Sequence, residues 1–475
     1  MPTSDRPQLV AIDLGAESCR VSLLQWRGET PHIELVHRFS NSPVTIGEGL
    51  HWDFSRVVSG IEDGLLRCAE KTSAPIAAIG VDGWAVDYVR LTETDLPIAQ
   101  PFCYRDLRTE ATEAELSQRC SREELFTLCG VQPLRINSLY QLMADNRAGI
   151  PSSARWVNLP EYLLARLGGK ISAEFTNATH TGLVDIQTRA WCPEVFELAG
   201  LDLGASPELV PTGTCVGVVQ GSLRNLHPFK ETQLIAPACH DTASAVAGIP
   251  LSGDDWAYIS SGTWSLVGAL IEQPIKSAAA CKAGFTNLGA AGNLICFHKN
   301  VNGMWLLKQT MNQLCPEDNP WPMAELVAAA EQVDDPVGTI DVDEPELWAA
   351  GNMASRINGQ LSRRGLAHIE EHPAAMPVFA RLIFHSLAER YATVLADVQT
   401  LTGKRLRKLA IVGGGSLNAF LNRLTAEATK LEVCPGVAES STTGNFAVQL
   451  ASLEGCADSP DRIAYWARSL ASGHC

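Results

Sequence analysis

The sequence of 475 residues lacks several features that would assign it to a large class of proteins. It contains no run of about 18 apolar residues, so we expect no membrane-spanning helix. Residues 1–6 include no apolar segment of the kind found in a secretory signal, which favours a cytoplasmic protein. None of the 14 cysteines belongs to a Cys-x-x-Cys pair. We therefore expect reduced, mostly buried thiols rather than disulfides or zinc ligands.

Positive charge is also scarce, with 37 Lys and Arg against 53 Asp and Glu and a net charge of −16. Nucleic acids and anionic membranes bind basic surfaces, so neither is an expected partner. A phosphorylated small molecule is compatible with this charge, because it needs only local N–H groups and one or two cations. The length exceeds the roughly 250–300 residues at which a single core stops growing, which predicts two domains.

The first phosphate-binding candidate is a short loop near the N-terminus. The apolar runs 9–12 and 21–24 flank Asp13–Arg20, a pattern that predicts a β-hairpin. Small residues and backbone N–H groups of this loop can hold phosphate oxygens, although the loop is not of the Walker type. Asp13, at the end of the first strand, can bind Mg²⁺ directly or through water. The alternative is an ordinary hairpin turn.

A second hairpin of the same kind is expected in the second half of the chain. Residues 257–260 and 264–268 are strand-like, and Ser261–Thr263 form the turn between them. The repeated pattern predicts a duplicated architecture, with one phosphate loop in each half and ligands in the cleft between the halves. The turn-forming residues 248–255 mark the boundary, which gives an N-terminal domain over 1–247 and a C-terminal domain over 248–475.

Near the middle of the chain, an imidazole and a carboxylate stand side by side. His240 and Asp241 follow the apolar run 233–237 and precede small residues that can open a helix. Helix N–H groups favour an ionised carboxylate, which suits a general base that takes a proton from a hydroxyl. The alternative is that Asp241 only caps the helix.

Polar residues elsewhere offer further contacts to a ligand. The strand 77–81 runs into Asp82 and Asp87, whose carboxylates can accept hydrogen bonds from sugar hydroxyls, or which belong to a surface turn. Residues 176–179 are expected to form a turn or the polar lining of the cleft. Residues 298–304 are expected to form a loop that enters a helix, with Asn300 within reach of the cleft.

Two short patterns in the second half call for separate interpretation. The glycines 413–415 lie between a strand and a helix, where bare backbone can contact a flat ring such as a nucleotide base; alone, this signal is weak. His368–His372 fits an inverted zinc-protease pattern. Pro373 would end the helix that has to present both imidazoles, so we expect a solvated helix end and no metal there.

Taken together, the segments stand in an order that resembles the FGGY carbohydrate kinases, within the actin-like ATPase superfamily. The resemblance extends from about residue 9 to residue 453. The motifs that carry it are Asp13–Ser18, Tyr104–Asp106, Thr176–Thr179, His240–Ser244, Ser260–Ser265 and Glu439–Thr442.

The resemblance implies an α/β fold with two actin-like (ribonuclease H-like) domains that flank a central cleft. Asp241 would be the catalytic proton acceptor, and Mg²⁺ would accompany ATP, with Asp13 its protein-side partner. The positions that would contact the sugar are Ala85, His240, Asp241, Thr242 and Asn300. The positions that would bind ATP are Ala16, Glu17, Ser18, Cys19, Arg20, Thr263, Lys308 and Gly414.

Four residues depart from the family's usual pattern. Cys19 replaces a common Gly in the first phosphate loop, and Lys308 stands where Gln is typical, which bears on nucleotide affinity. Gly83 stands where Thr is usual and Ala85 where Gly is usual, which bears on the identity of the sugar.

Within the family the resemblance is strongest to the members that phosphorylate L-rhamnulose at its 1-hydroxyl, in L-rhamnose degradation. The alternative substrates are other ketoses, such as L-fuculose or D-xylulose. A third hypothesis is a sugar sensor or a nucleotide-driven scaffold on the same fold; a DNA-binding sensor would need a basic extension that this acidic chain lacks. The expected protein acts as a monomer or a small homo-oligomer.

Overall fold

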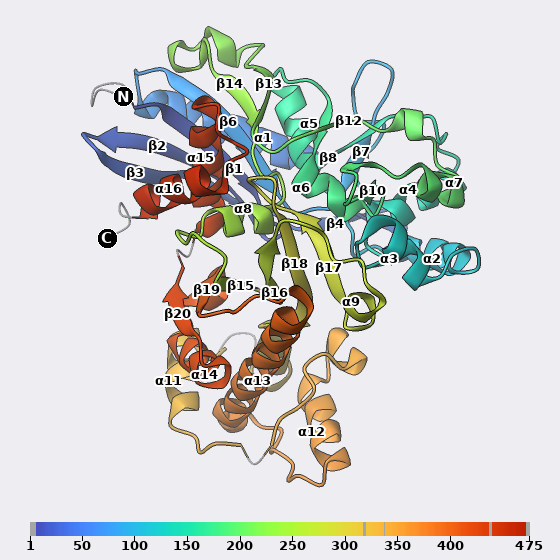
Figure 1. The fold of residues 1–475 in the computed structure, drawn as a ribbon, viewed down its shortest axis with the longest axis vertical. Coiled ribbons are helices and arrows are strands. Elements are labelled where there is room, and N and C mark those ends of the chain that lie inside the picture. Colours follow the sequence, from blue (N-terminus) through green and yellow to red (C-terminus); the bar gives the residue numbers. More distant parts are fainter. Residues whose placement is uncertain (1–5, 317–319, 337, 437–438, 472–475) are drawn as a thin grey trace. The chain divides into compact units, whose positions relative to one another are not determined.

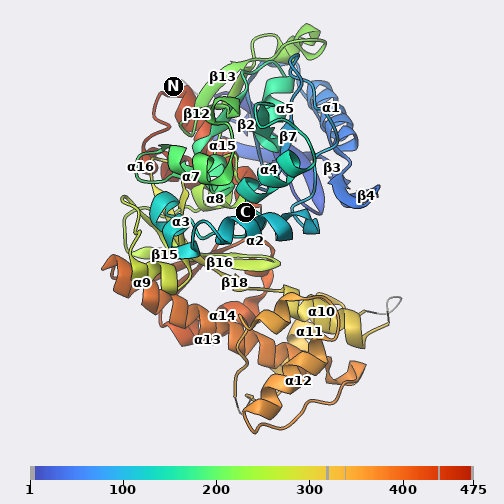
Figure 2. The ribbon, with the colours of Figure 1, turned by 90° about the vertical axis from the view of Figure 1, so that its right-hand side faces the viewer.

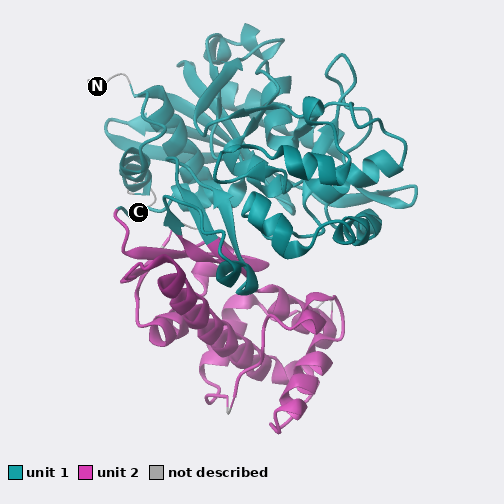
Figure 3. Cartoon of the chain, turned by 45° about the vertical axis from the view of Figure 1, so that its right-hand side comes forward, with its two compact units in different colours: residues 1–252, 270–297, 439–475 teal, residues 253–269, 298–438 magenta. Residues whose placement is uncertain are grey.

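The computed structural model describes residues 6–316, 320–336, 338–436 and 439–471 (Figure 1). The chain divides into two compact units, shown in two colours in Figure 3. Unit 1 comprises Met1–Ser252, Leu270–Phe297 and Glu439–Cys475, and unit 2 comprises Gly253–Ala269 and His298–Ala438. Within the described residues, no helix combines the length and the apolar character needed to cross a membrane.

Unit 1 is built on a six-stranded sheet with the order β13-β14-β6-β1-β2-β3. β1 (Gln8–Leu14) and β2 (Ser18–Arg27) form the predicted antiparallel hairpin, which β3 (Thr30–Ser40) extends. β6 (Ile76–Gly83) runs parallel to β1, and β14 (Gln233–Ala236) runs parallel to β6. The carboxyl ends of β1, β6 and β14 therefore point to the same side of the sheet, while β13 (Thr214–Val218) pairs antiparallel to β14 at the edge.

Both faces of this sheet are covered, which explains why its central strands are apolar without alternation. Val10 and Ile12 of β1 belong to one core cluster, together with side chains of α1 (Phe54–Lys71) and α5 (Leu159–Arg166). Leu9 and Ala11 belong to the cluster on the other face, with side chains of α15 (Ser440–Leu453) and α16 (Pro460–Ala471). In Figure 1 these two red helices lie beside the blue strands, although they are distant in sequence.

Unit 1 contains further strands and α-helices outside this sheet. The strands are β4 (Pro43–Ile46), β5 (Gly49–Trp52), β7 (Tyr88–Arg90), β8 (Trp156–Asn158), β9 (Ser172–Glu174), β10 (Val184–Asp185), β11 (Ala190–Trp191), β12 (Glu208–Val210) and β17 (Phe285–Gly289). The helices are α2 (Glu110–Ser117), α3 (Arg122–Cys129), α4 (Ser138–Arg147), α6 (Phe175–Ala178), α7 (Pro193–Ala199), α8 (Asp241–Ala247) and α9 (Ala278–Lys282).

Unit 2 repeats the central pattern of unit 1. Its hairpin consists of β15 (Trp256–Ser261) and β16 (Trp264–Ile271), as predicted, and β19 (Lys408–Val412) runs parallel to β15. β20 (Glu432–Pro435) continues the parallel arrangement, and β18 (Ile295–Asn302) lies next to β16, so that both β16 and β18 carry residues of both units. Helices α10 to α14 gather in this unit (Figure 2). They are α10 (Trp305–Leu314), α11 (Met323–Glu331), α12 (Met353–Arg363), α13 (Met376–Thr402) and α14 (Ala419–Thr429).

Three local predictions were wrong. Residues 298–302 lie in β18 rather than in a loop, because they continue the buried run Ile295–Phe297, and His298, Val301 and Asn302 are themselves buried. Residues 176–179 form α6 and the start of a 3-10 helix rather than a turn, and all four are buried. Residues 368–372 are irregular backbone that leads into a 3-10 helix capped by His372, rather than a helix that ends at Pro373.

Candidate active site

Three residues of neighbouring strands face one another in unit 1. Asp13 lies opposite Asp82 across the parallel pair of β1 and β6, and opposite Arg20 across the hairpin. Residues directly opposite in a sheet project from the same face, so two carboxylates and a guanidinium converge there. Asp13 and Asp82 are buried, with exposed fractions of 4% and 0%.

The start of α15 supplies partners for both aspartates. Ser441 donates its hydroxyl to Oδ2 of Asp13 at 2.7 Å, and Nδ2 of Asn445 donates to Oδ2 of Asp82 at 2.5 Å. Arg20 Nη1 donates to Asp13 Oδ2 at 3.0 Å and to Glu439 Oε2 at 2.8 Å. The N-terminus of a helix is the end that favours negative charge, so α15 stabilises this acidic group as a whole.

Burial governs the protonation of the two aspartates. It raises the pKa of Asp13, against the lowering effects of Arg20 and Ser441. It raises the pKa of Asp82 further, because the negative charge of Asp13 adds to the burial. Oδ1 of Asp82 is buried and has no hydrogen-bond partner within the protein. The carboxylates at this site are not fully neutralised by Arg20, so a bound cation would favour their charged forms.

Asp241 is the first residue of α8, and residues 237–240 separate it from the carboxyl-terminal end of β14. The cap position belongs to His240, which makes no side-chain capping bond, so the structure does not support the alternative that Asp241 is the cap. The Asp241 carboxylate has an exposed fraction of 37% and its Oδ1 lies 3.3 Å from His240 Nε2. The Thr242 hydroxyl donates to the same oxygen at 3.2 Å. Burial, followed by the charge of Asp13, raises the pKa of Asp241 to about 7.

The segment before Asp241 is held against the end of β6. Gly83 N–H donates to Cys239 O at 3.0 Å, and Gly83 forms an isolated parallel bridge with His240. A Cβ atom at Gly83 would lie 2.5 Å from Cβ of Leu14, which explains why a larger residue does not fit there. The structure therefore brings His240, Asp241 and Thr242 next to the stretch from Gly83 to Ala85, four of the five predicted sugar-contacting residues being in unit 1.

The first predicted phosphate loop is tight. A Cβ atom at Gly15 would lie 2.4 Å from Ser18 O, so the turn requires glycine. Among the five predicted ATP-binding residues from Ala16 to Arg20, Glu17 is exposed and Cys19 is fully buried in the core. Any contact of Cys19 with a ligand must therefore come from its backbone, and the Cys for Gly replacement leaves the outer surface of the loop unchanged.

The remaining predicted positions lie in unit 2. Thr263 in the turn of the second hairpin, Lys308 on α10 and Gly414 after β19 are all exposed, as is Asn300 on β18. The second hairpin packs on the start of α10: Met304 N–H donates to Gly262 O at 3.0 Å and Trp305 N–H to Thr263 O at 3.2 Å. This contact joins the hairpin turn to the helix that carries Lys308.

The glycines after β19 have different constraints. Gly413 has a φ of +80°, and its Cβ would lie 2.7 Å from Ser261 O. A Cβ at Gly415 would lie 2.0 Å from Ser261 Oγ, whereas one at Gly414 would contact nothing within 4 Å. Two of the three glycines thus allow the loop to pack on the second hairpin, and Gly414 leaves the backbone bare to a ligand.

Asp87, expected to accept hydrogen bonds from a sugar, is fully buried instead. Its Oδ2 accepts from Trp52 Nε1 at 2.6 Å and from Trp84 Nε1 at 3.0 Å, and its Oδ1 from Gln141 Nε2 at 3.0 Å. Its acceptors are occupied within the protein, so it fixes the loop after β6 rather than a ligand.

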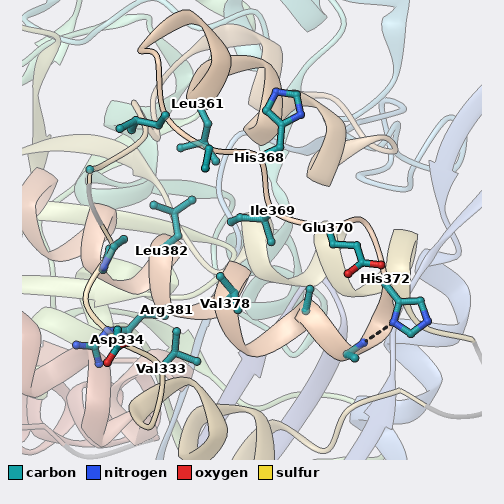
Figure 4. Close-up of a pocket in the computed structure, with 16 residues that line it drawn as sticks. Val333, Asp334, Leu361, His368, Ile369, Glu370, His372, Val378, Arg381 and Leu382 are labelled. Carbon is teal, nitrogen blue, oxygen red and sulfur yellow. Dashed lines mark hydrogen bonds between the residues drawn. The ribbon is translucent and has the colours of Figure 1, made fainter.

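His368 and His372 do not form a metal site. They line a cavity of about 550 Å³ in unit 2, and Figure 4 shows their rings well apart. His372 Nδ1 accepts from Ala374 N–H at 3.2 Å, which caps the 3-10 helix that starts at Pro373. No group of three or more potential ligands from His, Cys, Asp and Glu gathers anywhere in the described ranges.

The sequence places Glu439 and Ser441 only in a family motif at the start of a helix, and it predicts no contact of either residue, or of Asn445, with the aspartates. The signal was weak, because Ser and Thr at the start of a helix are typical of any N-terminus. The pairing of Asn445 with Asp82 joins positions 363 residues apart in sequence.

Comparisons with known proteins identify the family to which the chain belongs. The model of the FGGY family of carbohydrate kinases matches with its N-terminal domain over residues 8–248 and with its C-terminal domain over residues 257–453. A rhamnulokinase of Enterococcus faecalis is 34% identical over 445 residues, which is 93% of this chain and 88% of the relative. A rhamnulokinase of Enterobacter sp. is 35% identical over 450 residues, with 94% and 89% covered.

Solved structures of low identity share the fold. A gluconate kinase from Lactobacillus acidophilus superposes with a TM-score of 0.77 at 14% identity, over 98% of this chain and 95% of that one. A Plasmodium falciparum glycerol kinase with ADP superposes with a TM-score of 0.75 at 17% identity, over 97% and 92%. With its two α/β halves, its paired hairpins and both family domains matched, the chain belongs to the FGGY family of carbohydrate kinases, enzymes that take ATP as the phosphate donor.

Proposed function

We propose that this protein transfers the γ-phosphoryl group of ATP to the 1-hydroxyl of L-rhamnulose, giving L-rhamnulose 1-phosphate and ADP. The relatives named rhamnulokinase support this substrate, because they match at 34–35% identity over most of both chains. The observation that carries the reaction is the carboxylate of Asp241. It stands half-exposed at the first turn of α8 beside His240, with a pKa raised to about 7.

In the proposed mechanism, Asp241 accepts the proton of the 1-hydroxyl as the oxygen attacks the γ-phosphorus in line. A base with a pKa near the operating pH combines ionisation with proton affinity, and such catalysis contributes roughly 10²–10⁴-fold in rate. The N-terminal position on α8 holds the carboxylate on a rigid element. His240, Thr242, Ala85 and Asn300 are the proposed contacts to the other atoms of the sugar.

The phosphates of ATP are proposed to bind the two hairpin turns. In unit 1 the ligands are the backbone N–H groups and side chains from Ala16 to Arg20. In unit 2 they are Thr263 and Lys308, with Gly414 against the base. Arg20 is also a partner of Asp13, so the first loop and the acidic site are joined by one side chain.

The acidic site fits Mg²⁺. Its oxygen donors are the type this ion prefers, and Mg²⁺ usually binds one or two carboxylates together with phosphates and water rather than a closed protein cage. The buried Oδ1 of Asp82 lacks a partner, and burial raises the pKa of both Asp13 and Asp82, as expected for carboxylates that await a cation. Asp13 is the proposed Mg²⁺ ligand, and Asp82, opposite Asp13 on β6, adds negative charge beside it. When bound, the ion would offset negative charge on the transferring phosphoryl group.

Two measurements test the proposal. A panel of L-rhamnulose, L-fuculose, D-xylulose and D-ribulose, with ADP release as the readout, identifies the sugar; a higher kcat/KM for any other ketose than for L-rhamnulose would reject the substrate assignment. Asp241→Asn should still bind the ketose but lose at least about 10²-fold in turnover. Near-normal turnover in that variant would reject Asp241 as the base.

A further inference from the structure

A second buried carboxylate lies behind the proposed base, outside the site described above. Glu174 ends β9 and is fully buried. Its Oε1 accepts hydrogen bonds from Thr176 N–H at 3.0 Å and from the Thr212 hydroxyl at 2.5 Å. Its Oε2 accepts from the Thr176 hydroxyl at 2.5 Å and from Cys239 N–H at 2.9 Å. Donors from three parts of the chain thus surround the Glu174 carboxylate.

The bond to Cys239 matters because Cys239 leads into His240 and Asp241. The Cys239 carbonyl already accepts from Gly83 N–H at 3.0 Å. With Glu174 on its N–H and Gly83 on its carbonyl, this residue is fixed on both sides. The peptide that sets the direction of His240 and Asp241 is therefore held by a side chain that touches neither.

The helical segment that starts at Glu174 also reaches His240. The Thr176 hydroxyl accepts from His240 N–H at 3.4 Å. The ring of His180, four residues further on, lies 3.8 Å from the ring of His240 between centroids, at an angle of 48°. One short segment thus contacts the backbone and the side chain of the residue next to the proposed base.

Glu161 completes the arrangement on the far side of Glu174. Its Oε1 accepts from Glu174 N–H at 3.1 Å and its Oε2 from Asn177 Nδ2 at 2.8 Å. Burial and the neighbouring charge of Glu174 raise the pKa of Glu161 to about 8. Burial raises the pKa of Glu174 as well, against five N–H and O–H donors that favour its charged form.

We propose that Glu174 is the positioning residue for the catalytic segment, acting on Asp241 through the N–H of Cys239 and, with Thr176, through the N–H of His240. This inference rests on the proposed role of Asp241 as the base. Glu174 touches neither substrate nor phosphate; it fixes the backbone from which the base projects.

The substitution Glu174→Gln separates this role from simple packing. Glutamine has almost the same shape, but one of its two terminal atoms is an NH₂ donor. The hydroxyls of Thr176 and Thr212 can rotate and accept, whereas the N–H groups of Thr176 and Cys239 cannot. They face opposite oxygens of Glu174, so one of them must lose its acceptor. Whichever N–H group loses its acceptor, the link that Glu174 makes between the Thr176 segment and the Cys239 peptide is broken.

Glu161→Gln is the matched control, since it makes the same chemical change at a buried carboxyl that is already neutral at pH 7. Glutamine at 161 can keep the acceptor for Glu174 N–H, and it can donate to Asn177 Oδ1 once the Asn177 amide turns over, since that oxygen has no hydrogen-bond partner among the described residues now. Both variants are assayed for kcat and for the KM of ATP and of the best ketose of the panel, and again in the Asp241→Asn background.

The expected result is a fall in kcat of about 10–100-fold for Glu174→Gln, because a misplacement of about 1 Å costs about 10²-fold. Glu161→Gln should stay within about threefold, and the KM for ATP should stay within about twofold in both. In the Asp241→Asn background the effect of Glu174→Gln should largely vanish, because a residue that acts through Asp241 has nothing left to position. A purely structural role would instead lower the rate by the same factor in both backgrounds.

A kcat of Glu174→Gln within threefold of the parent would overturn the inference, as would equal losses in the two backgrounds. If Asp241→Asn alone keeps its turnover, the proposed base is wrong and this inference falls with it. If Asp241→Asn is inactive and Glu174→Gln is normal, only this inference falls. Should Glu174→Gln not fold, Thr176→Val replaces it, and Thr176→Ser, which keeps the hydroxyl, should restore the rate.

Discussion

Gly444, in the second turn of α15, offers the sharpest test of how the acidic site is held. A Cβ atom there would lie 1.8 Å from Ser244 O and 2.7 Å from Gly248 N, both in or next to α8. The reverse contact is also too close, since a Cβ at Gly248 would lie 2.2 Å from Ser440 O. The two helices therefore meet backbone to backbone, and Gly444→Ala has no space in the present structure.

The size of the effect follows from these distances. An ordinary contact of about 3.4 Å requires the helices to separate by roughly 1.6 Å at this point, and backbone on both sides cannot rotate away. Overpacking of this kind costs about 3 kcal/mol, the upper end of the usual range. Helix propensity acts in the opposite direction, because Ala is favoured over Gly by about 1 kcal/mol. The sign of the measured change therefore decides between tertiary packing and local preference.

Activity should fall with stability, because α8 carries Asp241 and the start of α15 carries Ser441, whose bond to Asp13 is 2.7 Å long. We expect Gly444→Ala to lower the melting temperature by roughly 3–5 °C in calorimetry and kcat by about 10-fold or more. The control is Gly359→Ala in α12, where a Cβ would meet only the end of Arg363 at 3.7 Å; it should raise stability by about 0.4–1 kcal/mol. A Gly444→Ala variant as stable as its parent would refute the close approach of α8 and α15.

Three further predictions follow from other parts of the structure. Asp241 must be deprotonated to act as a base, and its pKa is raised to about 7, so kcat/KM for the ketose should fall about tenfold for each pH unit below 7. A kcat/KM profile that stays flat down to about pH 5.5 would contradict the role of Asp241 as the base. The pKa of Glu161 is raised from 4.5 to about 8 in the folded protein, so its protonated form stabilises the fold at low pH, and this stability is lost as the pH rises from about 4.5 to 8. Glu161→Gln should therefore make the free energy of unfolding less dependent on pH in this range. An unchanged slope would argue against the raised pKa. Gly415→Ala should destabilise unit 2 by about 1–3 kcal/mol and raise the KM for ATP, because its Cβ would meet Ser261 Oγ at 2.0 Å. Gly414→Ala, whose Cβ would meet nothing within 4 Å, should leave the unfolding temperature unchanged. Equal melting curves for the two variants would refute this packing.

The hairpins and the strand ends were predictable because their signals are local. The apolar runs around Asp13–Arg20 and Ser261–Thr263 specify strands, and the small residues between them specify turns. The strand-to-helix junction at His240 and Asp241 was predictable for the same reason. These segments carry most of the proposed catalytic residues.

The partners of the aspartates were not predictable, because they depend on contacts between distant parts of the chain. Nothing local marks Asn445 as the partner of Asp82 or Glu174 as the acceptor for Cys239 N–H. The Thr and Asn residues of 176–179 suit a turn or the lining of a cleft, whereas in the structure they are buried and Glu174, Glu161 and backbone carbonyls accept most of their hydrogen bonds. Polar residues that are paired in the interior look like surface residues in a sequence.

The bond between Ser441 and Asp13 also bears on the timing of biosynthesis. The two residues are 428 positions apart, so at about 5–20 residues per second the ribosome adds Ser441 roughly 20–90 s after Asp13. Throughout that interval the N-terminal sheet lacks α15 over one face, and Leu9 and Ala11 lack their final cover. The nascent chain therefore exposes an apolar surface for most of its synthesis, and it becomes competent for phosphoryl transfer only in the last steps of translation.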